Sequence, residues 1–300
     1  MDQLGIRVVL NGKSAGRDDV RQAIEAVRAE GHAISVRVTY EAGDVERIVR
    51  EALQDRSVID VLVAAGGDGT INEVVAALIE CLSADEEVPF NMGILPLGTA
   101  NDFARGAEMN PADILACLKA AVSKDARPVD IGRLNDRVFV NMATGGFGAK
   151  VTVETDPKLK SLIGGAAYLF TGLQRFSELV GFKAKVRGEN MSWEGEFLAM
   201  AIGNGRQAGG GIELCPDARI DDGLLDLTII PSPKRDEVSK VLEHLVKQGL
   251  PSLREQVISA QGAQFSIEAE TPIQFNLDGE PVAGDRFDVR VEPGRLKLVV

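Results

Sequence analysis

Cysteine and histidine are scarce in this 300-residue sequence, which contains three of the former and two of the latter. The cysteines are odd in number, lie far apart and have no metal-ligand spacing: Cys81, Cys117 and Cys215. They argue against a disulfide framework and predict reduced, buried thiols. His32 and His244 are too isolated for a metal cluster, and we expect a structural role for His32 at the end of a helix.

Long hydrophobic runs are also lacking. A membrane-spanning helix needs about 20 predominantly apolar residues, whereas the longest weakly polar stretch, Ile163 to Leu173, is shorter and contains three glycines. The first residues lack the basic and apolar regions of a signal peptide. We therefore expect a cytoplasmic protein without a transmembrane segment.

Positive charge is in deficit, because 33 Lys and Arg face 45 Asp and Glu, a formal net charge of −12. Nucleic acid is not an expected partner, since that binding depends on neutralising phosphates. General attraction to anionic membranes is disfavoured for the same reason. A phosphorylated ligand must therefore be bound by a local site of backbone N–H groups, a few cations or a metal.

Short apolar runs alternate with helical patterns in the first third of the chain. The expected strands span 6–10, 34–39, 59–64 and 92–95, and the expected helices span 18–30, 44–53, 71–82 and 111–122. Nearly all of 59–64 is apolar, as in a strand that is covered on both faces. This alternation predicts an α/β domain with a parallel sheet and helices on both sides.

Beyond Arg127-Pro128, short β-rich runs separated by glycines and turns dominate. They span 138–140, 197–202, 224–230, 265–267, 273–275 and 287–291, with helical patterns near 158–176 and 234–248. Such runs are typical of a second, mostly antiparallel β domain.

The segment Gly66-Gly67-Asp68-Gly69-Thr70 stands between the third expected strand and the next helix. Glycines at this place let the backbone approach a bulky anion, and the helix N-terminus offers unpaired N–H groups to phosphate. Thr70 with Glu73 also fits a capping box. A tight turn with an ordinary cap is the alternative, but the flanking strand and helix favour phosphate binding.

A second turn, Gly98-Thr99-Ala100-Asn101-Asp102-Phe103, follows the next strand. In open α/β sheets, ligands bind outside the carboxyl ends of the strands. Gly98, Thr99 and Asn101 could therefore converge on the same ligand, and Asn11, at the end of the first strand, could border it. The alternative is that Thr99 or Asn101 merely caps the following helix.

Two turns in the second part are acidic. Asp217 to Asp226 places several carboxylates around a glycine, and hard cations favour such carboxylate and carbonyl oxygens. Asp278-Gly279-Glu280 follows a strand and could supply a general base that deprotonates a hydroxyl. A solvated turn and an ordinary hairpin turn remain the respective alternatives.

In order and spacing, four of these segments resemble the diacylglycerol-kinase-like lipid kinases, and especially their bacterial YegS-type branch: 66–70, 98–104, 222–226 and 278–280. The segment 204–211 belongs to the closer likeness, whereas Ala65 stands where a further glycine often occurs. The resemblance covers nearly the whole chain. It implies an ATP-binding α/β domain (1–128, completed by the last strand, 294–300) and a β-sandwich domain for the lipid substrate and a metal (129–293).

The resemblance also implies site residues. ATP would contact Thr39, Gly67, Asp68, Gly69, Thr70, Ile71, Asn72, Glu73 and Thr99. Mg²⁺, or also Ca²⁺, would be held by the Asp222 carboxylate and the main-chain carbonyls of Arg219 and Leu224. Glu280 would accept the proton of the lipid hydroxyl.

The implied activity is transfer of the γ-phosphate of ATP to a lipid hydroxyl, with phosphatidylglycerol as the acceptor and diacylglycerol as the alternative. An NAD kinase shares the Gly-Gly-Asp-Gly-Thr turn, but the segment 98–103 favours the lipid kinases. A non-catalytic regulator is disfavoured because Asp68 and Glu280 are both present. Transient docking on the membrane is one interpretation of Lys158 to Phe170, and a core helix is the other. The sequence assigns no oligomeric state.

Overall fold

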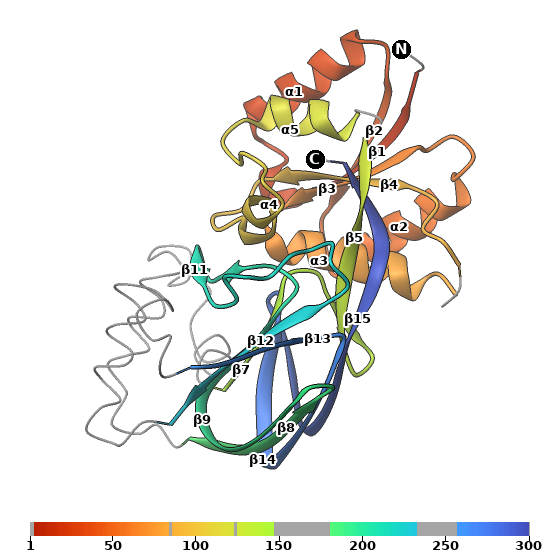
Figure 1. Ribbon diagram of the computed structural model, residues 1–300. Coiled ribbons are helices and arrows are strands. Elements are labelled where there is room, and N and C mark those ends of the chain that lie inside the picture. Colours follow the sequence, from red (N-terminus) through yellow and green to blue (C-terminus); the bar gives the residue numbers. More distant parts are fainter. Residues whose placement is uncertain (1–2, 84–85, 123–124, 147–180, 233–256, 300) are drawn as a thin grey trace. The chain divides into compact units, whose positions relative to one another are not determined.

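The computed structural model describes residues 3–83, 86–122, 125–146, 181–232 and 257–299 (Figure 1). These residues divide into two compact units, which are treated separately below. Unit 1 comprises residues 1–130 and 293–300, and unit 2 comprises residues 131–292. The helical patterns expected at 158–176 and 234–248, and with them the docking stretch 158–170, lie outside the described residues.

Four neighbouring strands of unit 1 run parallel in the order β4-β3-β1-β2. Their bounds are β1 (Gly5–Asn11), β2 (Ala33–Thr39), β3 (Val61–Gly66) and β4 (Asn91–Pro96). The last part of β15 (Glu280–Val299) returns to this sheet, where Leu298 pairs in parallel with Met92 of β4. β5 (Ala126–Leu134) pairs with β15.

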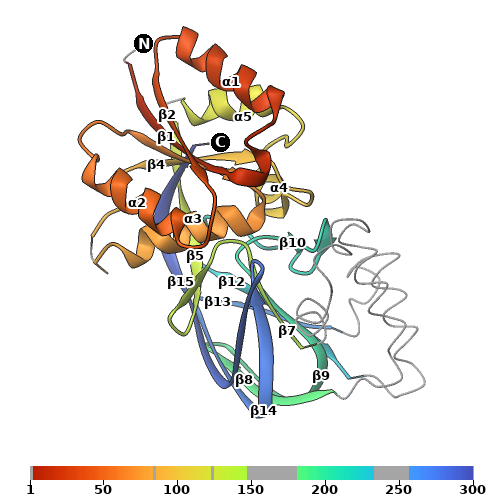
Figure 2. The same cartoon turned by 180° about the vertical axis from the view of Figure 1, so that it is seen from behind.

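Helices cover both faces of the unit 1 sheet. Figures 1 and 2 show α1 (Asp18–Ala29) and α5 (Ile114–Ala121) on one face, and α2 (Asp44–Gln54) and α3 (Asp68–Glu80) on the other. Side chains alternate across a strand, so Ile6, Val8 and Leu10 of β1 pack into the core beneath α1. Two short helices, η1 (Gly12–Ser14) and α4 (Asp102–Gly106), follow β1 and β4.

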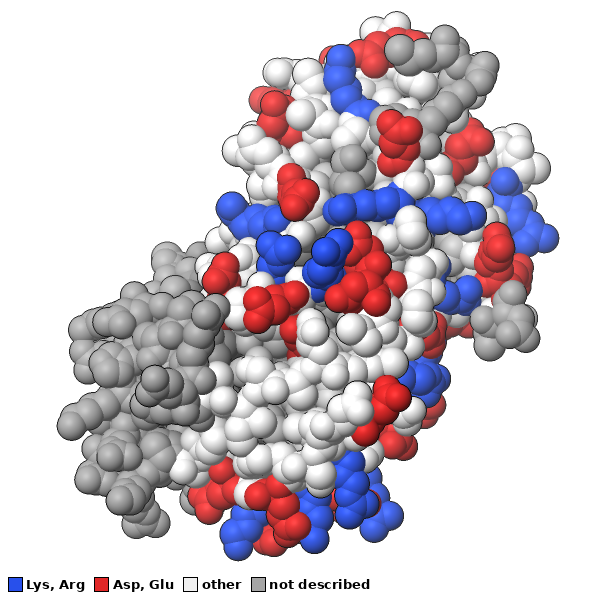
Figure 3. Space-filling model, in the orientation of Figure 1, with Lys and Arg blue, Asp and Glu red and all other residues white. Residues whose placement is uncertain are grey.

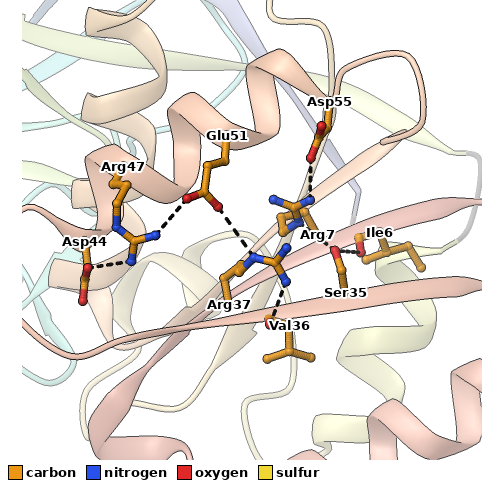
Figure 4. Close-up of polar contacts among 9 residues, drawn as sticks. All are labelled: Ile6, Arg7, Ser35, Val36, Arg37, Asp44, Arg47, Glu51 and Asp55. Atoms are coloured by element: carbon orange, nitrogen blue, oxygen red, sulfur yellow. Dashed lines mark hydrogen bonds and ion pairs between the residues drawn. The ribbon is translucent and has the colours of Figure 1, made fainter.

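Arginine side chains tie α2 to the edge of the sheet (Figure 4). Arg7, only 5% exposed, donates from Nε to Ser35 Oγ at 2.7 Å and from Nη2 to Asp55 Oδ2 at 3.0 Å. Arg37 of β2 pairs with Glu51 of α2. These contacts hold the helix that follows β2, and with it the loop between them.

The sequence-based roles of His32 and the cysteines are largely confirmed. His32 is buried after α1, and its Nδ1 accepts a hydrogen bond from the backbone N–H of Leu4 at 3.3 Å. All three cysteines are free, and Cys117 and Cys215 are buried. The expectation of burial is wrong for Cys81, which is half-buried because it stands at the C-terminal cap of α3.

Unit 2 is built from antiparallel strands in the order β13-β12-β9-β7-β14-β15, with β8 pairing to both β9 and β14. The bounds are β6 (Arg137–Phe139), β7 (Met142–Gly146), β8 (Phe182–Gly188), β9 (Met191–Gly203), β12 (Leu225–Pro231), β13 (Ile258–Gly262) and β14 (Gln264–Leu277). β10 (Gln207–Ala208) and β11 (Ile212–Glu213) form a separate small hairpin. The core of unit 2 is rich in phenylalanine, and the rings of Phe275 and Phe287 meet edge to face with centroids 4.8 Å apart.

The runs expected at 265–267 and 273–275 belong to one strand, β14. Its pairing with β15 shifts register between Glu268 and Ile273, an irregularity that interrupts the alternation without ending the strand.

On the face drawn in Figure 3, acidic and basic side chains are intermingled. Within the described ranges, no helix combines the length and the apolar composition that crossing a bilayer requires.

Candidate functional site

The carboxyl ends of the four parallel strands of unit 1 meet at one edge. Asn11 pairs with Thr39 where β1 and β2 end, and Gly66 pairs with Pro96 where β3 and β4 end. Both glycine turns singled out in the sequence begin here. This edge is where open α/β sheets bind ligands.

The first glycine turn leads directly into α3. The N-cap is Gly67, with φ −85° and ψ −176°, and no side chain makes the capping hydrogen bond. The expected capping box is therefore wrong: Thr70 lies inside the helix, and its Oγ1 accepts a hydrogen bond from Asn11 Nδ2 at 2.9 Å. The N–H groups of Thr70 and Ile71 donate to Gly67 O at 2.9 and 3.1 Å. Because no side chain caps this N-terminus, the N–H groups that precede them can meet an anion.

The two glycine turns touch each other. A Cβ added at Gly98 would lie 2.5 Å from Gly67 Cα, so the backbones approach as closely as only glycines allow. The backbone N–H of Leu97 donates to Gly66 O at 2.8 Å, and that of Phe103 donates to Asp68 Oδ1 at 3.0 Å. The Asp68 carboxylate therefore joins the start of α3 to the start of α4.

Asn101 shapes the second turn from within. It adopts a left-handed conformation, with φ 52°. Its Oδ1 accepts from the Gly98 N–H at 2.8 Å, and its Nδ2 donates to Gly98 O at 2.9 Å. Asn101 stands at the N-cap of α4 as one interpretation expected, but makes no capping hydrogen bond. Its amide is occupied within the turn, whereas Thr99 is exposed.

The ends of β1 and β2 are linked to each other. The Gly12 N–H donates to Thr39 Oγ1 at 3.3 Å, and the Lys13 N–H donates to Asn11 Oδ1 at 3.0 Å. Together with the bond from Asn11 to Thr70, these contacts form a continuous polar rim from β2 to α3.

The nine residues expected to contact ATP lie in this rim, in the two glycine turns and in the following residues of α3, but their exposure differs. Gly69, Glu73 and Thr99 are exposed, Thr39, Gly67 and Asp68 are half-buried, and Thr70, Ile71 and Asn72 are buried. Ile71, 1% exposed, belongs to the core, so only its main chain can meet a ligand. Asn72 is 4% exposed, and its Oδ1 has no hydrogen-bond partner among the residues that the structure describes.

In unit 2, Asp278 and Glu280 have different surroundings. Asp278 Oδ2 accepts from the N–H groups of Val140 and Asn141 at 2.7 and 2.9 Å, and Oδ1 accepts from that of Met142 at 2.8 Å. Because both of its oxygens accept hydrogen bonds from main-chain donors, Asp278 holds the start of β7 and is a weaker candidate for the general base than Glu280. Glu280 is exposed at the first position of β15.

The turn between Asp278 and Glu280 has a simple local cause. Asp278 and Gly279 both have positive φ, 50° and 113°, and Leu277 pairs with Glu280 across them. A two-residue hairpin loop of this kind favours Asp-Gly. The ordinary hairpin interpretation is thus correct for the backbone, and it places the Glu280 carboxylate outward.

The acidic turn 217–226 presents oxygen atoms around Gly223. Asp222 is exposed, and its Oδ1 accepts from the Leu224 N–H at 3.0 Å. The Nε of Arg206, from the segment of closer likeness, donates to Ala218 O at 3.1 Å and braces the turn. Within the described ranges, no group of three or more His, Cys, Asp or Glu side chains could hold a metal ion.

Asp226 ends this acidic segment as the second residue of β12, and it is buried. Burial raises the pKa of the Asp226 carboxyl to about 6, although the hydrogen bonds from Gln261 lower it. The negative charges of Asp222 and Asp217 raise this pKa further. The carboxylates of Asp217, Asp222 and Asp226 therefore lie close enough to influence one another. One carboxylate with main-chain carbonyls is also the oxygen donor set that a hard cation accepts, so the residues fit such an ion.

The two parts of the chain match two known families. Residues 5–134 match the diacylglycerol kinase catalytic domain, and residues 141–300 match the YegS C-terminal NAD kinase beta sandwich-like domain. A solved structure of a putative diacylglycerol kinase from Bacillus anthracis str. Sterne has a similar fold. It is 22% identical with a TM-score of 0.81, and the match covers 99% of this chain and 95% of that chain.

Curated relatives are similar over almost their whole length. A probable lipid kinase YegS-like of Pseudomonas aeruginosa is 47% identical, with 99% of this chain and 95% of the relative covered. A protein of the same description from Cronobacter sakazakii is 46% identical, with 98% and 95% covered. By these matches, the chain belongs to the YegS-type lipid kinases of the diacylglycerol-kinase-like family.

Proposed function

We propose that this kinase transfers the γ-phosphate of ATP to the hydroxyl of a membrane lipid, with phosphatidylglycerol as the acceptor. The observation that carries the proposal is the contact between the two glycine turns at the uncapped N-terminus of α3. In this proposal unit 1 is the ATP-binding domain, and unit 2 is the domain of the lipid substrate and the metal.

The phosphates of ATP would lie on the main-chain N–H groups that begin α3, because these groups and the helix dipole favour negative charge. Gly67, Gly69 and Thr99 would leave room for them, and Thr39 would border the nucleotide on the β2 side. The Asp68 carboxylate, in the first turn of the same helix, would repel phosphate unless a cation lies between them. Asp68 therefore supports binding of ATP together with Mg²⁺.

Phosphoryl transfer needs positioning and charge neutralisation more than covalent help. Glu280 would accept the proton of the lipid hydroxyl while the hydroxyl oxygen forms a bond to the γ-phosphorus. At the same time the bond between the γ-phosphorus and the β,γ-bridging oxygen would break, which releases ADP. The exposure of Glu280 leaves it accessible to a substrate, and the three bonds to Asp278 hold the turn that carries it.

Asp222 and the carbonyls of Arg219 and Leu224 would hold Mg²⁺, or Ca²⁺ in its place. The ion would neutralise the carboxylate charge at this turn. Two hydrogen bonds that hold the backbone of the turn support this proposal: Asp222 accepts from the Leu224 N–H, and Arg206 donates to the carbonyl of Ala218.

The test is transfer of labelled γ-phosphate from ATP to three acceptors offered separately: phosphatidylglycerol and diacylglycerol in detergent, and NAD. We expect label on phosphatidylglycerol and none on NAD. Label on diacylglycerol alone would make the chain a diacylglycerol kinase, an alternative that the matched catalytic domain favours. Label on NAD alone would overturn the proposal.

A further inference from the structure

Tyr40 is an unusually exposed aromatic residue at the site edge. Within the described residues, the exposed large hydrophobic side chains are Val38 (44%), Tyr40 (96%), Val58 (69%) and Leu115 (39%). Tyr40 is the one aromatic residue among these four, and it directly follows Thr39, the last residue of β2. A nearly free ring thus stands beside the polar rim.

The other exposed hydrophobic residues divide between this edge and remote places. Val58 precedes β3 at the opposite, amino end of the sheet, where its carbonyl contacts the first residue of β1, Gly5. Leu115 lies on α5, which packs beside α1. Val38 shares the end of β2 with Tyr40, so these two form the exposed apolar surface at the carboxyl edge.

This apolar surface is continuous with the phosphate turn. A Cβ added at Gly12 would lie 2.2 Å from Thr39 O and 3.8 Å from Val38 Cγ1, so the end of β1 lies close against the end of β2 and beside the Val38 side chain. The Gly12 N–H bonds to Thr39, and Asn11 bonds to Thr70 of α3. A ligand with a charged end and a planar apolar end could extend along this rim.

The backbone under the ring is held in place. Asp44 Oδ2 accepts from the N–H groups of Tyr40 and Glu41 at 2.6 and 3.0 Å, and Asp44 Oδ1 accepts from Arg47 Nη2 at 2.7 Å. Arg47 in turn reaches Glu51 of α2 at 2.9 Å (Figure 4). An exposed ring on a fixed backbone loses little conformational freedom when it binds a partner.

We propose that Tyr40 is a nucleobase-stacking residue, on which the adenine of ATP lies while the phosphates occupy the glycine turns. The inference rests on the proposed function. It extends that function from the phosphates of ATP to the adenine base. Aromatic side chains stack on any base and strengthen binding by about ten- to a hundredfold. A membrane is the weaker occupant, because Glu41 is an exposed negative charge next to the ring in sequence and anionic lipids repel such a charge.

The experiment compares binding of ATP and of inorganic triphosphate by calorimetry. Tyr40→Ala should weaken ATP binding about tenfold or more and leave triphosphate binding unchanged. In turnover assays, KM for ATP should rise while kcat stays near the wild-type value. Tyr40→Phe keeps the aromatic ring, so its affinity for ATP and its KM for ATP should stay near the wild-type values. Val58→Ala, which removes an exposed apolar side chain at the opposite edge, is the matched control and should bind ATP normally.

A Tyr40→Trp variant reports on the ring directly. The natural sequence has a single tryptophan, Trp193 in unit 2, so the added fluorescence is obtained by difference from the wild type. ATP should quench it, and triphosphate should not.

Three results would overturn the inference in distinguishable ways. If Tyr40→Ala binds ATP normally while Asp68→Ala loses it, the base lies elsewhere and the proposed function stands. If the wild type binds no ATP, the proposed function fails as well. A loss of turnover confined to lipid in vesicles, with ATP binding unchanged, would instead assign Tyr40 to the membrane surface.

Discussion

Asp68 and Phe103 are joined by a hydrogen bond in which the backbone N–H of Phe103 donates to Asp68 Oδ1 at 3.0 Å. The bond fastens α4 to α3, and the two glycine turns meet between these helices. One carboxylate thus has two separable properties. Its oxygen positions the second turn, and its charge is available to a cation that accompanies ATP.

Substitutions at Asp68 separate these properties. Asp68→Asn keeps a carbonyl oxygen for the Phe103 N–H, so the fold should persist while γ-phosphate transfer falls by roughly 10²–10³, as when a group that stabilises transition-state charge is lost. Asp68→Ala also leaves the N–H unpaired and should cost a further 1–3 kcal/mol, roughly, in the free energy of unfolding. Transfer assays and thermal unfolding measure the two effects. Normal turnover of Asp68→Asn would confine this residue to positioning.

Gly98→Ala tests the contact between the turns. The new Cβ would lie 2.5 Å from Gly67 Cα and 2.9 Å from Asn101 Oδ1, so the turns must separate. We expect ATP binding to weaken at least tenfold and stability to fall by about 1–3 kcal/mol, as in other overpacked sites. Gly106→Ala is the control, because its Cβ would meet no atom within 4 Å. Equal ATP affinity in both variants would contradict a phosphate site here.

The glycine turns could be found in the sequence because each stands where a strand gives way to a helix. Helix boundaries were harder to predict from the sequence. The helix α3 begins at Asp68 rather than at the expected Ile71, because Gly67 is its N-cap and Thr70, inside the helix, bonds to Asn11 of β1. The five-residue helix α4 carries too little periodicity to be recognised.

Roles that depend on distant main-chain groups could not be predicted. The sequence shows two carboxylates at one turn, Asp278 and Glu280, but it does not show that Asp278 is bonded to N–H groups of the segment 140–142. Likewise, the burial of Asp226 follows from its position in β12 between β9 and β13. The spacing of the acidic turn alone does not reveal it.

Glu280→Gln tests the general base. The substitution keeps size and shape but removes the proton-accepting charge, so turnover should fall by roughly 10²–10⁴. Because Glu280 is exposed, stability and ATP binding should be unchanged. Asp278→Asn is the matched comparison. It loses charge-assisted bonds to three N–H groups and should lower the free energy of unfolding by about 1.5–3 kcal/mol. Near-normal turnover of Glu280→Gln would remove Glu280 from the proton transfer.

The metal proposal predicts a stability that depends on Mg²⁺. An ion that binds only the folded state raises the melting temperature with concentration, so millimolar Mg²⁺ should stabilise the wild type and not Asp222→Asn. Asp221→Asn, which removes the neighbouring carboxylate, should keep the response. Stabilisation by Ca²⁺ but not Mg²⁺ would assign the larger ion. The absence of any ion at this turn in anomalous scattering at millimolar metal would contradict the site.

Asp44 predicts how stability depends on pH. The hydrogen bond from Arg47, followed by those from the N–H groups of Glu41 and Tyr40, lowers the pKa of its carboxyl to about 2. A lowered pKa contributes stability that is fully present above the unfolded value near 3.9 and is lost as the pH falls toward 2.

Asp44→Asn should therefore be less stable than the wild type by an amount that stays constant from pH 8 to about 5 and shrinks below about 4. Urea unfolding across this range measures the difference. Asp285→Asn, at an exposed carboxylate, is the control and should show no comparable trend. A difference that persists unchanged to pH 3 would mean that the asparagine disturbs the loop by its shape, because a purely electrostatic contribution must vanish as the aspartate protonates.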